Sequence, residues 1–445
     1  MFLLMMSGGL FLFAWLFLAL PLFRKSRAFL PVTLALLVLA GRDLFFYLND
    51  QPWYGQEYPL WANMLSSALF GALVIVAILS VPWAILFGIF RLLKMEAIRE
   101  LRGGLTFVLI LLSCSAAFFC VHQGYSMPSD INYTVGSMMV PRGFDSTRIV
   151  QVTDLHFFKG TSDRRIDDLA KRVIAAKPDL ILFTGDLVDG TVGQRSAQLR
   201  RFIDDLKKGC SPRFGMISVP GNHEYYSGDY AGWMSFLRDQ GITVLENSNV
   251  KLTAENGDAL YVAGVTDRAA ERFGGEKPDF AKATAGIPRD AGVIMLSHRP
   301  YRPQGTFDRA FLVFTGHTHG GMIPGVDLIV KYENEGYVSG LYHDYGRSLI
   351  VSNGTGIWSG FPLRLAPHVA DNVIVTLKSE NTLLQLCTIN DASVFFEASL
   401  TCHRCKKSSE DELKSIKTKN SSGAVSYENI RIFIGSLRRD ADALV

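Results

Sequence analysis

Apolar residues follow two different patterns along this chain of 445 residues. Before about residue 124 they form long runs without charge, and after it they form short runs separated by polar turns. A helix that crosses a membrane needs about 20 mostly apolar residues. Four stretches approach this length: Met1–Phe23, Ala28–Asn49, Trp61–Phe90 and Leu105–Gln123. The pattern therefore predicts an α-helical membrane bundle of about four spans over residues 1–124.

The first two runs carry further information. The first has neither a positively charged leader nor a small-residue cleavage site, so we expect a retained helix rather than a removed signal peptide. The second is interrupted by Arg42 and Asp43. Charged side chains are costly in lipid, so these two are expected near an interface or facing other helices.

Basic residues between the runs predict how the bundle is oriented. The loops after the first and third runs are rich in Lys and Arg: Arg24, Lys25 and Arg27, then Arg91, Lys94, Arg99 and Arg102. The loop Asp50–Leu60 has none. Cytoplasmic loops carry an excess of Lys and Arg. We therefore expect a multi-pass protein of the cell membrane whose large domain lies outside the cytoplasm.

After residue 147, apolar runs and amphipathic segments alternate. The strands Arg148–Thr153 and Leu180–Phe183 flank a helix over Asp163–Ala176, which predicts a parallel βαβ unit. Further helices are expected at Gly193–Lys208 and Tyr230–Gln240. Further strands are expected at Arg213–Val219, Thr243–Leu245, Val250–Thr253, Leu260–Gly264, Gly292–Leu296, Ala310–Phe314, Ser348–Ser352 and Asn372–Leu377. The fold class expected after the membrane bundle is therefore α/β.

Charge and cysteine content change this picture little. The net charge of +3 lacks the basic excess of a nucleic-acid-binding protein, so no nucleic acid partner is expected. Cys402 and Cys405 form a lone C-x-x-C in a polar tail. A zinc site would need a second pair, so free thiols or one disulfide are favoured there.

Candidate chemistry lies where the first two strands end. Asp154 and His156 follow one strand, and Asp186 and Asp189 follow the next. Parallel strands end at the same edge of a sheet, so these side chains should lie close together. Carboxylates that close repel one another unless a positive charge lies among them. The simplest such charge is a metal ion.

Later strands end in similar residues. Of the nine histidines in the chain, five fall in these loops: His156, His223, His298, His317 and His319. Asn222 directly precedes His223. Each motif alone is common by chance, but five independent accidents are less likely than one shared site. Imidazole, carboxylate and amide ligands together suit Mn, Fe or Zn rather than calcium.

In this order the motifs resemble those of the calcineurin-like metallophosphoesterases. The blocks are D-x-H at Asp154, G-D-x-x-D at Gly185, G-N-H-E at Gly221, then His298, then G-H-T-H-G-G at Gly316. The resemblance covers about Arg148–Leu377 and is greatest to the membrane-associated bacterial branch. Members of that branch often have a Pro-Pro-Glu-like run before the last strand. This chain has Ala-Pro-His-Val there instead, at Ala366–Val369.

The resemblance implies a β-sandwich flanked by helices, with two divalent metal ions at the strand ends. One metal would bind Asp154, His156 and His319, and the other would bind Asn222, His298 and His317. Asp186 would bridge the two metals, His223 would be the general acid, and Asp189 would hold a ligand histidine. Glu224 and Asp163 are expected in solvent. Arg299, Tyr225, Tyr226 and Arg364 are expected either to touch substrate or to pack at the rim.

Together these features predict four regions and one activity. The regions are the membrane bundle 1–124, a linker 125–147 with strand-like pieces, the metallophosphoesterase domain 148–378 and an extension 379–445 of unknown function. The activity is hydrolysis of a phosphoester or pyrophosphate by a hydroxide held by two metals. A domain tethered beside membrane lipids suggests a membrane-associated or lipid-linked substrate. The alternatives are a non-catalytic membrane sensor or scaffold, and a cytoplasm-facing enzyme that acts on cyclic nucleotides or phosphoproteins.

Overall fold

The computed structural model describes residues 2–48, 59–300, 309–344, 347–358 and 360–380. These residues belong to one unit, Met1–Glu380, and Asn381–Val445 form a second unit that lies outside the described part. The Cys402 and Cys405 pair and the expected extension fall in that second unit.

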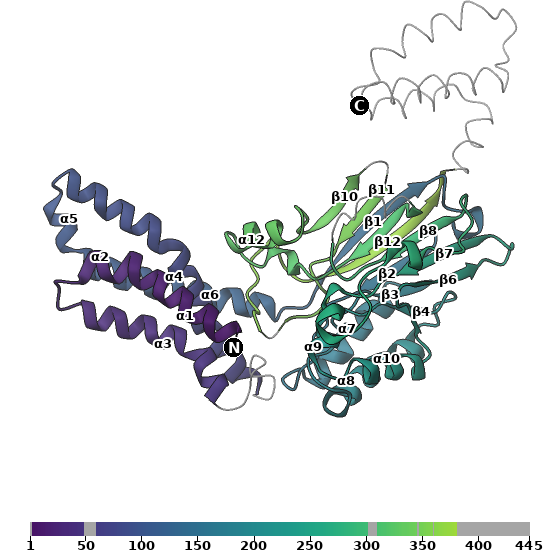
Figure 1. The fold of residues 1–445 in the computed structure, drawn as a ribbon, viewed down its shortest axis with the longest axis horizontal. Helices are drawn as coiled ribbons and strands as arrows, with labels where there is room; N and C mark the ends of the chain where they lie inside the picture. Colours follow the sequence, from purple (N-terminus) through teal and green to yellow (C-terminus); the bar gives the residue numbers. More distant parts are fainter. Residues whose placement is uncertain (1, 49–58, 301–308, 345–346, 359, 381–445) are drawn as a thin grey trace, which may run out of the picture. The chain divides into compact units, whose positions relative to one another are not determined.

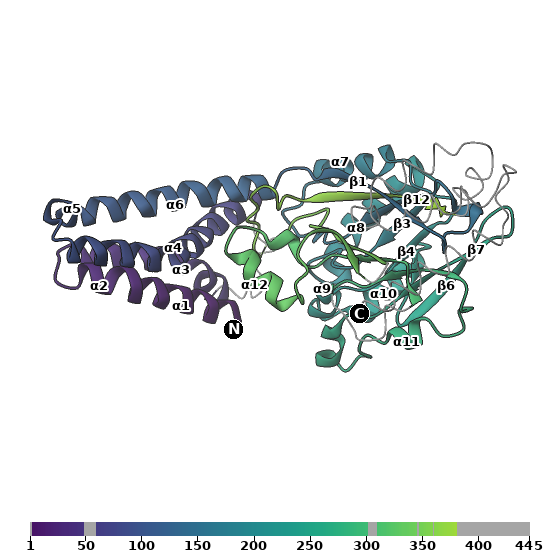
Figure 2. The ribbon, with the colours of Figure 1, turned by 90° about the horizontal axis from the view of Figure 1, so that it is seen from above.

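The first part of the chain is helical, as expected. Its elements are α1 (Phe2–Ala14), η1 (Trp15–Ala19), α2 (Leu20–Phe23), α3 (Phe29–Leu48), α4 (Leu60–Leu92), α5 (Glu96–Glu100) and α6 (Arg102–Gly124). Among the described residues, three stretches are long and apolar enough to cross a membrane: Leu4–Phe23, Leu60–Leu92 and Arg102–Gly124. Figure 2 shows α4 and α6 running side by side.

Helix α3 forms where the second span was expected, but it is not one of these three stretches. Its Arg42 and Asp43 are both buried. The Ser7 hydroxyl donates to Asp43, and Nη2 of Arg42 donates to the carbonyl oxygen of Gly360 at 2.8 Å. The expectation that these charges avoid lipid is thus confirmed, because both bind polar groups inside the protein.

The second part consists of two mixed six-stranded sheets (Figure 1). The first has the order β1-β12-β2-β3-β4-β5. Its strands are β1 (Ser129–Ser137), β12 (Asp371–Ser379), β2 (Arg148–Val152), β3 (Leu180–Phe183), β4 (Met216–Ser218) and β5 (Thr243–Val244). The second has the order β10-β11-β9-β8-β7-β6. Its strands are β10 (Gly340–Asp344), β11 (Arg347–Val351), β9 (Leu312–Thr315), β8 (Gly292–Leu296), β7 (Ala259–Gly264) and β6 (Ser248–Thr253).

The helices of this part are α7 (Asp163–Ala175), α8 (Val192–Gly209), α9 (Asn222–Tyr226), α10 (Tyr230–Asp239), α11 (Phe280–Ala283) and α12 (Val326–Glu333). Short 3-10 turns occur at η2 (Arg142–Phe144), η3 (Arg268–Phe273) and η5 (His319–Gly321). The predicted βαβ unit is confirmed, because β2 and β3 pair in parallel across α7. Within the expected linker, whose sequence contains strand-like pieces, Ser129–Ser137 is a strand that pairs in parallel with β12.

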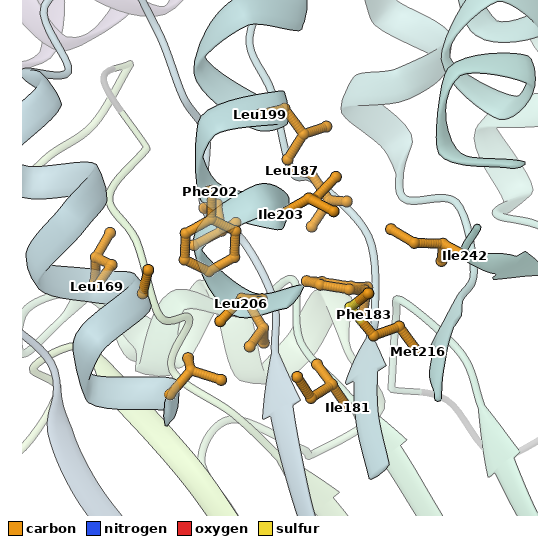
Figure 3. Packing of buried hydrophobic residues seen from close by; sticks show 14 of the residues in the cluster. Leu169, Ile181, Phe183, Leu187, Leu199, Phe202, Ile203, Leu206, Met216 and Ile242 are labelled. Carbon is orange, nitrogen blue, oxygen red and sulfur yellow. The ribbon is translucent and has the colours of Figure 1, made fainter. Parts of the chain in front are cut away.

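Two layers of apolar side chains hold the sheets and helices together. Ile149 and Leu182 of the first sheet meet Leu296 and Phe314 of the second in a core between the sheets. The opposite face of the first sheet is covered by α7 and α8, as Figure 3 shows. Side chains in β3 are buried on both faces, which explains why the sequence Leu-Ile-Leu-Phe has no polar alternation.

Helix α7 illustrates how the sequence specifies one covering helix. The hydroxyl of Ser162 caps it by accepting the Arg165 N–H at 3.3 Å. Its buried residues recur at intervals of three and four, which places them on one face: Ile166, Leu169, Ala170 and Val173.

A loop of the second part packs directly on helices α4 and α6, two of the three candidate membrane spans. Leu363 is completely buried, and a Cβ on Gly71 of α4 would lie 2.4 Å from its side chain. The Arg364 N–H donates to the carbonyl oxygen of Cys120 in α6 at 3.0 Å. A Cβ on Gly124 would lie 2.1 Å from the carbonyl oxygen of Pro362. The loop therefore approaches these helices closely enough to require glycine.

We predict that Gly124→Ala destabilises the protein and that Gly104→Ala, in the same helix, does not. The new methyl at position 124 would meet a backbone oxygen, whereas position 104 has open space around it. Overpacking of this kind costs about 1–3 kcal/mol. Thermal unfolding of the full chain in detergent checks this, and equal midpoints for the two variants would contradict the packing described here.

Candidate metal centre

The predicted site residues all lie at one edge of the two sheets, in loops that follow five strands. Asp154 and His156 follow β2, Asp186 and Asp189 follow β3, Asn222 and His223 follow β4, His298 follows β8, and His317 and His319 follow β9. All nine are buried except His317, which is half-buried. The fold thus brings together every site residue that the sequence suggested.

The backbone at this edge is unusual. Five of these residues, none of them glycine, have φ between 46° and 69°: Asp154, His156, Asp186, His317 and His319. Residues with a Cβ rarely adopt this left-handed region. Such strain costs about 1–3 kcal/mol each and persists where the surrounding structure enforces it, which is typical of functional sites. The sequence gives no sign of this feature.

The first group of candidate ligands is Asp154, His156 and His319, whose ligand atoms lie within 4.8 Å of one another. Nδ1 of His156 lies 3.0 Å from Oδ1 of Asp189. The other ring nitrogen, Nε2, is buried without a hydrogen-bond partner. It lies 3.8 Å from Oδ1 of Asp154 and 3.7 Å from Oδ2 of Asp186. An imidazole nitrogen in this position has the geometry of a metal ligand.

The second group contains Asp186, His298 and His317. Nδ1 of His298 lies 2.8 Å from the carbonyl oxygen of Thr184, so it carries the proton and donates. Nε2 is thereby directed toward Oδ2 of Asp186 and Oδ1 of Asn222, each at 3.1 Å. Asn222, His298 and Asp186 therefore converge on one point.

Arg299 also reaches this second group. Its Nη2 donates to Oδ1 of Asn222 at 2.9 Å, and its Nη1 donates to Nε2 of His317 at 2.7 Å. Its Nε donates to Oδ2 of the buried Asp267 at 2.8 Å. The sequence suggested contact with substrate or packing at the rim, whereas the guanidinium in fact contacts two candidate ligands.

His223 and Asp189 form a pair beside the first group. Nδ1 of His223 lies 2.7 Å from Oδ1 of Asp189, the same oxygen that faces His156. The backbone N–H of His223 donates to Oδ1 of Asp186 at 2.7 Å. One carboxylate oxygen thus faces two histidine rings, and His156, Asp189 and His223 form a third group whose ligand atoms lie within 4.8 Å of one another.

The charges of the centre favour a cation. Burial alone would lower the pKa of His298, but the Asp186 carboxylate beside it raises that pKa to about 9. Burial would likewise lower the pKa of His156, and Asp189 holds it well above its ordinary value. The same excess of buried negative charge attracts a divalent ion. The donor set and the unpartnered Nε2 of His156 fit divalent metal ions of the Mn, Fe or Zn kind.

The expectation that Glu224 lies in solvent is wrong. The residue is 2 % exposed. Its carboxylate accepts backbone N–H groups of Gly221 at 2.7 Å, Leu187 at 2.8 Å and Asp186 at 3.0 Å. The residue joins two of the site loops through their backbones. Asp163 is exposed, as expected.

Trp358 was missed by the sequence analysis. Its ring is nearly parallel to that of His319, with centroids 6.0 Å apart, and nearly perpendicular to that of His223 at 5.9 Å. No motif contains it, and it reaches the site only because its loop folds back over the strand ends.

The structure shows the contacts of three residues whose role the sequence left open. Arg364 is buried, donates to the carbonyl oxygen of His319 and lies 2.7 Å from Nδ1 of that ring. Tyr225 is buried and stacks on Tyr230, whereas the Tyr226 ring lies 5.6 Å from that of His223.

Comparison with known proteins shows which proteins this chain is similar to. The sequence model of the calcineurin-like phosphoesterase family matches residues 147–321. A "Transmembrane protein with metallophosphoesterase domain" of Danio rerio is 26% identical over 336 residues, or 73% of this chain and 74% of that protein. An "Uncharacterized metallophosphoesterase" of Aquifex aeolicus is 30% identical over 252 residues, or 56% of this chain and 91% of that protein.

Other similarities are more limited. The "Transmembrane protein with metallophosphoesterase domain" of Bos taurus is 30% identical, and the match spans about half of each protein, 51% of this chain and 52% of that one. The solved structure of a dimetal phosphatase from Danio rerio is 12% identical and covers 52% of this chain and 93% of that one. Its TM-score of 0.31 is too low to support an argument.

We predict that Glu224→Gln lowers the unfolding midpoint of the full chain, whereas Glu255→Gln leaves it unchanged. A glutamine keeps one acceptor oxygen, so at least one of the three buried N–H groups would lose its partner. Leaving such a group unsatisfied costs about 1–3 kcal/mol. Glu255 is exposed and serves as the matched control. Thermal unfolding in detergent is the measurement, and identical midpoints would show that the carboxylate does not join the loops.

Proposed function

This chain belongs to the calcineurin-like phosphoesterase family, and on that premise we propose that its buried centre binds two divalent metal ions and hydrolyses a phosphoester or pyrophosphate bond. The observation that carries this proposal is Nε2 of His156, which is buried without a hydrogen-bond partner and points between two carboxylates. Most buried histidines have both ring nitrogens hydrogen-bonded, so a free nitrogen aimed between two carboxylates fits a metal ligand.

In this proposal each residue has one role. Asp154, His156 and His319 would hold one metal, Asn222, His298 and His317 would hold the other, and Asp186 would bridge them. Bound ions of the Mn, Fe or Zn kind would polarise the phosphoryl group and activate a water molecule. Asp189 would fix the His156 ring through the contact at 3.0 Å.

His223 would protonate the leaving oxygen. Its Nδ1 is engaged by Asp189 at 2.7 Å, which leaves Nε2 as the nitrogen that can donate a proton to substrate. Its side chain is 8% exposed, so it is sheltered and still reachable from the solvent side. Trp358 and Tyr226, whose rings flank it, would keep its orientation and exclude water from one side.

The substrate in this proposal is membrane-associated or lipid-linked, and the domain lies outside the cytoplasm. The two basic loops support this arrangement, because Nε of Arg102 donates to the carbonyl oxygen of Leu22 at 3.1 Å and both loops therefore lie at one end of the bundle. In this proposal α3 crosses the membrane together with the three candidate spans, since only four crossings put both basic loops on the same side. One observation favours the alternative of a non-catalytic sensor or scaffold: Arg299 contacts Asn222 and His317, where the second metal would bind. The full set of ligand candidates with His223 beside it favours the enzyme.

We predict metal-dependent hydrolysis of aryl phosphomonoesters or diesters by the full chain in detergent. The metal-free protein should be inactive and added Mn should restore activity. Asp186→Asn should abolish turnover, because the bridging ligand is weakened. His223→Ala should lower kcat by about 10²–10⁴-fold, as expected for a lost general acid. The controls Asp290→Asn and His343→Ala change exposed residues outside the centre and should retain full activity.

Two results would contradict the enzyme. Stoichiometric metal binding by calorimetry without turnover of any phosphoester would favour the sensor. Equal activity of Asp186→Asn and Asp290→Asn would show that the two-metal centre takes no part in the reaction.

We also predict the sidedness of the domain. A reporter that is active only outside the cytoplasm, fused after Val445 and expressed in a bacterial host, should be active. The same reporter inserted after Ala97, in the basic loop between α4 and α6, should be silent. The opposite pattern would place the domain in the cytoplasm and favour soluble phosphorylated substrates.

A further inference from the structure

Helix α12 exposes large apolar side chains directly after the metal loop. It begins five residues after His319–Gly321, at Val326. Leu328, Ile329 and Tyr332 are 68%, 65% and 84% exposed, and no residue of the helix is buried. Three large apolar residues on one helix of eight are more than a water-facing helix needs.

These side chains form one outward stripe. At 3.6 residues per turn, Leu328, Tyr332 and Ile329 lie within an arc of about 100°. Lys331 flanks one side of the stripe and Glu333 the other, and both are exposed. An apolar stripe bordered by charged residues and carrying a tyrosine is typical of a helix that lies in a membrane interface.

The stripe is continuous with helices that span the membrane. A Cβ on Gly325, the residue before α12, would lie 3.3 Å from Cδ1 of Ile78 in α4. Ile323 is buried in a cluster with Phe70 and Val74 of α4 and Val121 of α6, and Val326 packs against that cluster. On α4, residues around this contact expose their apolar side chains: Ile78 by 42%, Leu79 by 36% and Ile85 by 58%.

The contact lies at the depth of the lipid. Ile78 precedes Arg91, which ends the apolar run of α4, by 13 residues. At 1.5 Å per residue this is about 20 Å, less than the roughly 30 Å thickness of the hydrocarbon core. A helix that starts beside Ile78 therefore starts at the level of the leaflet opposite Arg91.

We propose that α12 binds the lipid of the membrane that α4 and α6 span, with Leu328, Ile329 and Tyr332 among the acyl chains and Lys331 at the headgroups. A long lysine side chain at such a position carries its charge to the water interface. A second copy of the chain on the same stripe is the competing occupant. Continuity with the exposed apolar side chains Ile78, Leu79 and Ile85 of α4 favours the bilayer, because the lipid around a spanning helix would cover both surfaces.

Photocrosslinking tests the proposal without depending on catalysis. The full chain, with benzoylphenylalanine in place of Ile329 or of Tyr332, is reconstituted in vesicles of phosphatidylethanolamine and phosphatidylglycerol that contain an alkyne-tagged phospholipid. We expect lipid adducts at both positions, several times stronger than at Phe273. That control residue is also apolar and 52% exposed, and it lies in η3, which none of the contacts above joins to the membrane helices.

The probe is placed at two positions, Ile329 and Tyr332, so that a local effect of the probe at one of them can be recognised. Lipid labelling at 329 and 332 no stronger than at 273 would overturn the proposal. A crosslinked dimer in place of lipid adducts would also overturn it and assign the stripe to a second copy. Lipid adducts in a protein without phosphoesterase activity would support the docking of α12 while contradicting the proposed function, so the two failures are distinguishable.

Discussion

The crowding of three buried carboxylates is the constraint on which the rest of the site depends. Asp154, Asp186 and Asp189 all lie within the loops that follow β2 and β3, and each is 2% exposed or less. Carboxylates that lie this close together and are shielded from water are unfavourable without positive charge among them. The histidine rings meet part of this need: neighbouring carboxylates raise the pKa of His156 and of His298, whereas burial lowers the pKa of His317 and of His319. A divalent ion would meet the rest.

The scaffold keeps this unfavourable arrangement together in two ways. Parallel strands of both sheets end at the same edge, so the loops have little freedom to separate. The loops are then joined to one another by buried hydrogen bonds, of which the three to Glu224 are the clearest. Together these restraints hold five ligand candidates at positive φ, a conformation that an isolated loop would leave.

The centre is also connected to the membrane helices. Arg364 donates its backbone N–H to Cys120 in α6 and contacts the backbone and ring of His319 with its guanidinium. On the other side of His319, the chain continues through Ile323 into α12. The residues around one candidate metal ligand are thus packed against α4 and α6. Helices α4 and α6 are therefore part of the packing that surrounds His319.

The sequence by itself determined most of the strands, the helices that cover the first sheet and the polar residues at the strand ends, whereas β10 was not expected. Short apolar runs followed by Asp, His or Asn mark the strand ends, and local patterns of this kind depend only on neighbouring residues. Glu224, Trp358 and the contacts of Arg299 could not be found that way. Glu224 is a charged residue in the short helix α9, and its sequence context suggests exposure to solvent until its partners in the loop after β3 are known. The same holds for α12, whose apolar residues look ordinary in sequence. Only the tertiary structure decided these points, because burial and contact between distant segments depend on how the whole chain packs.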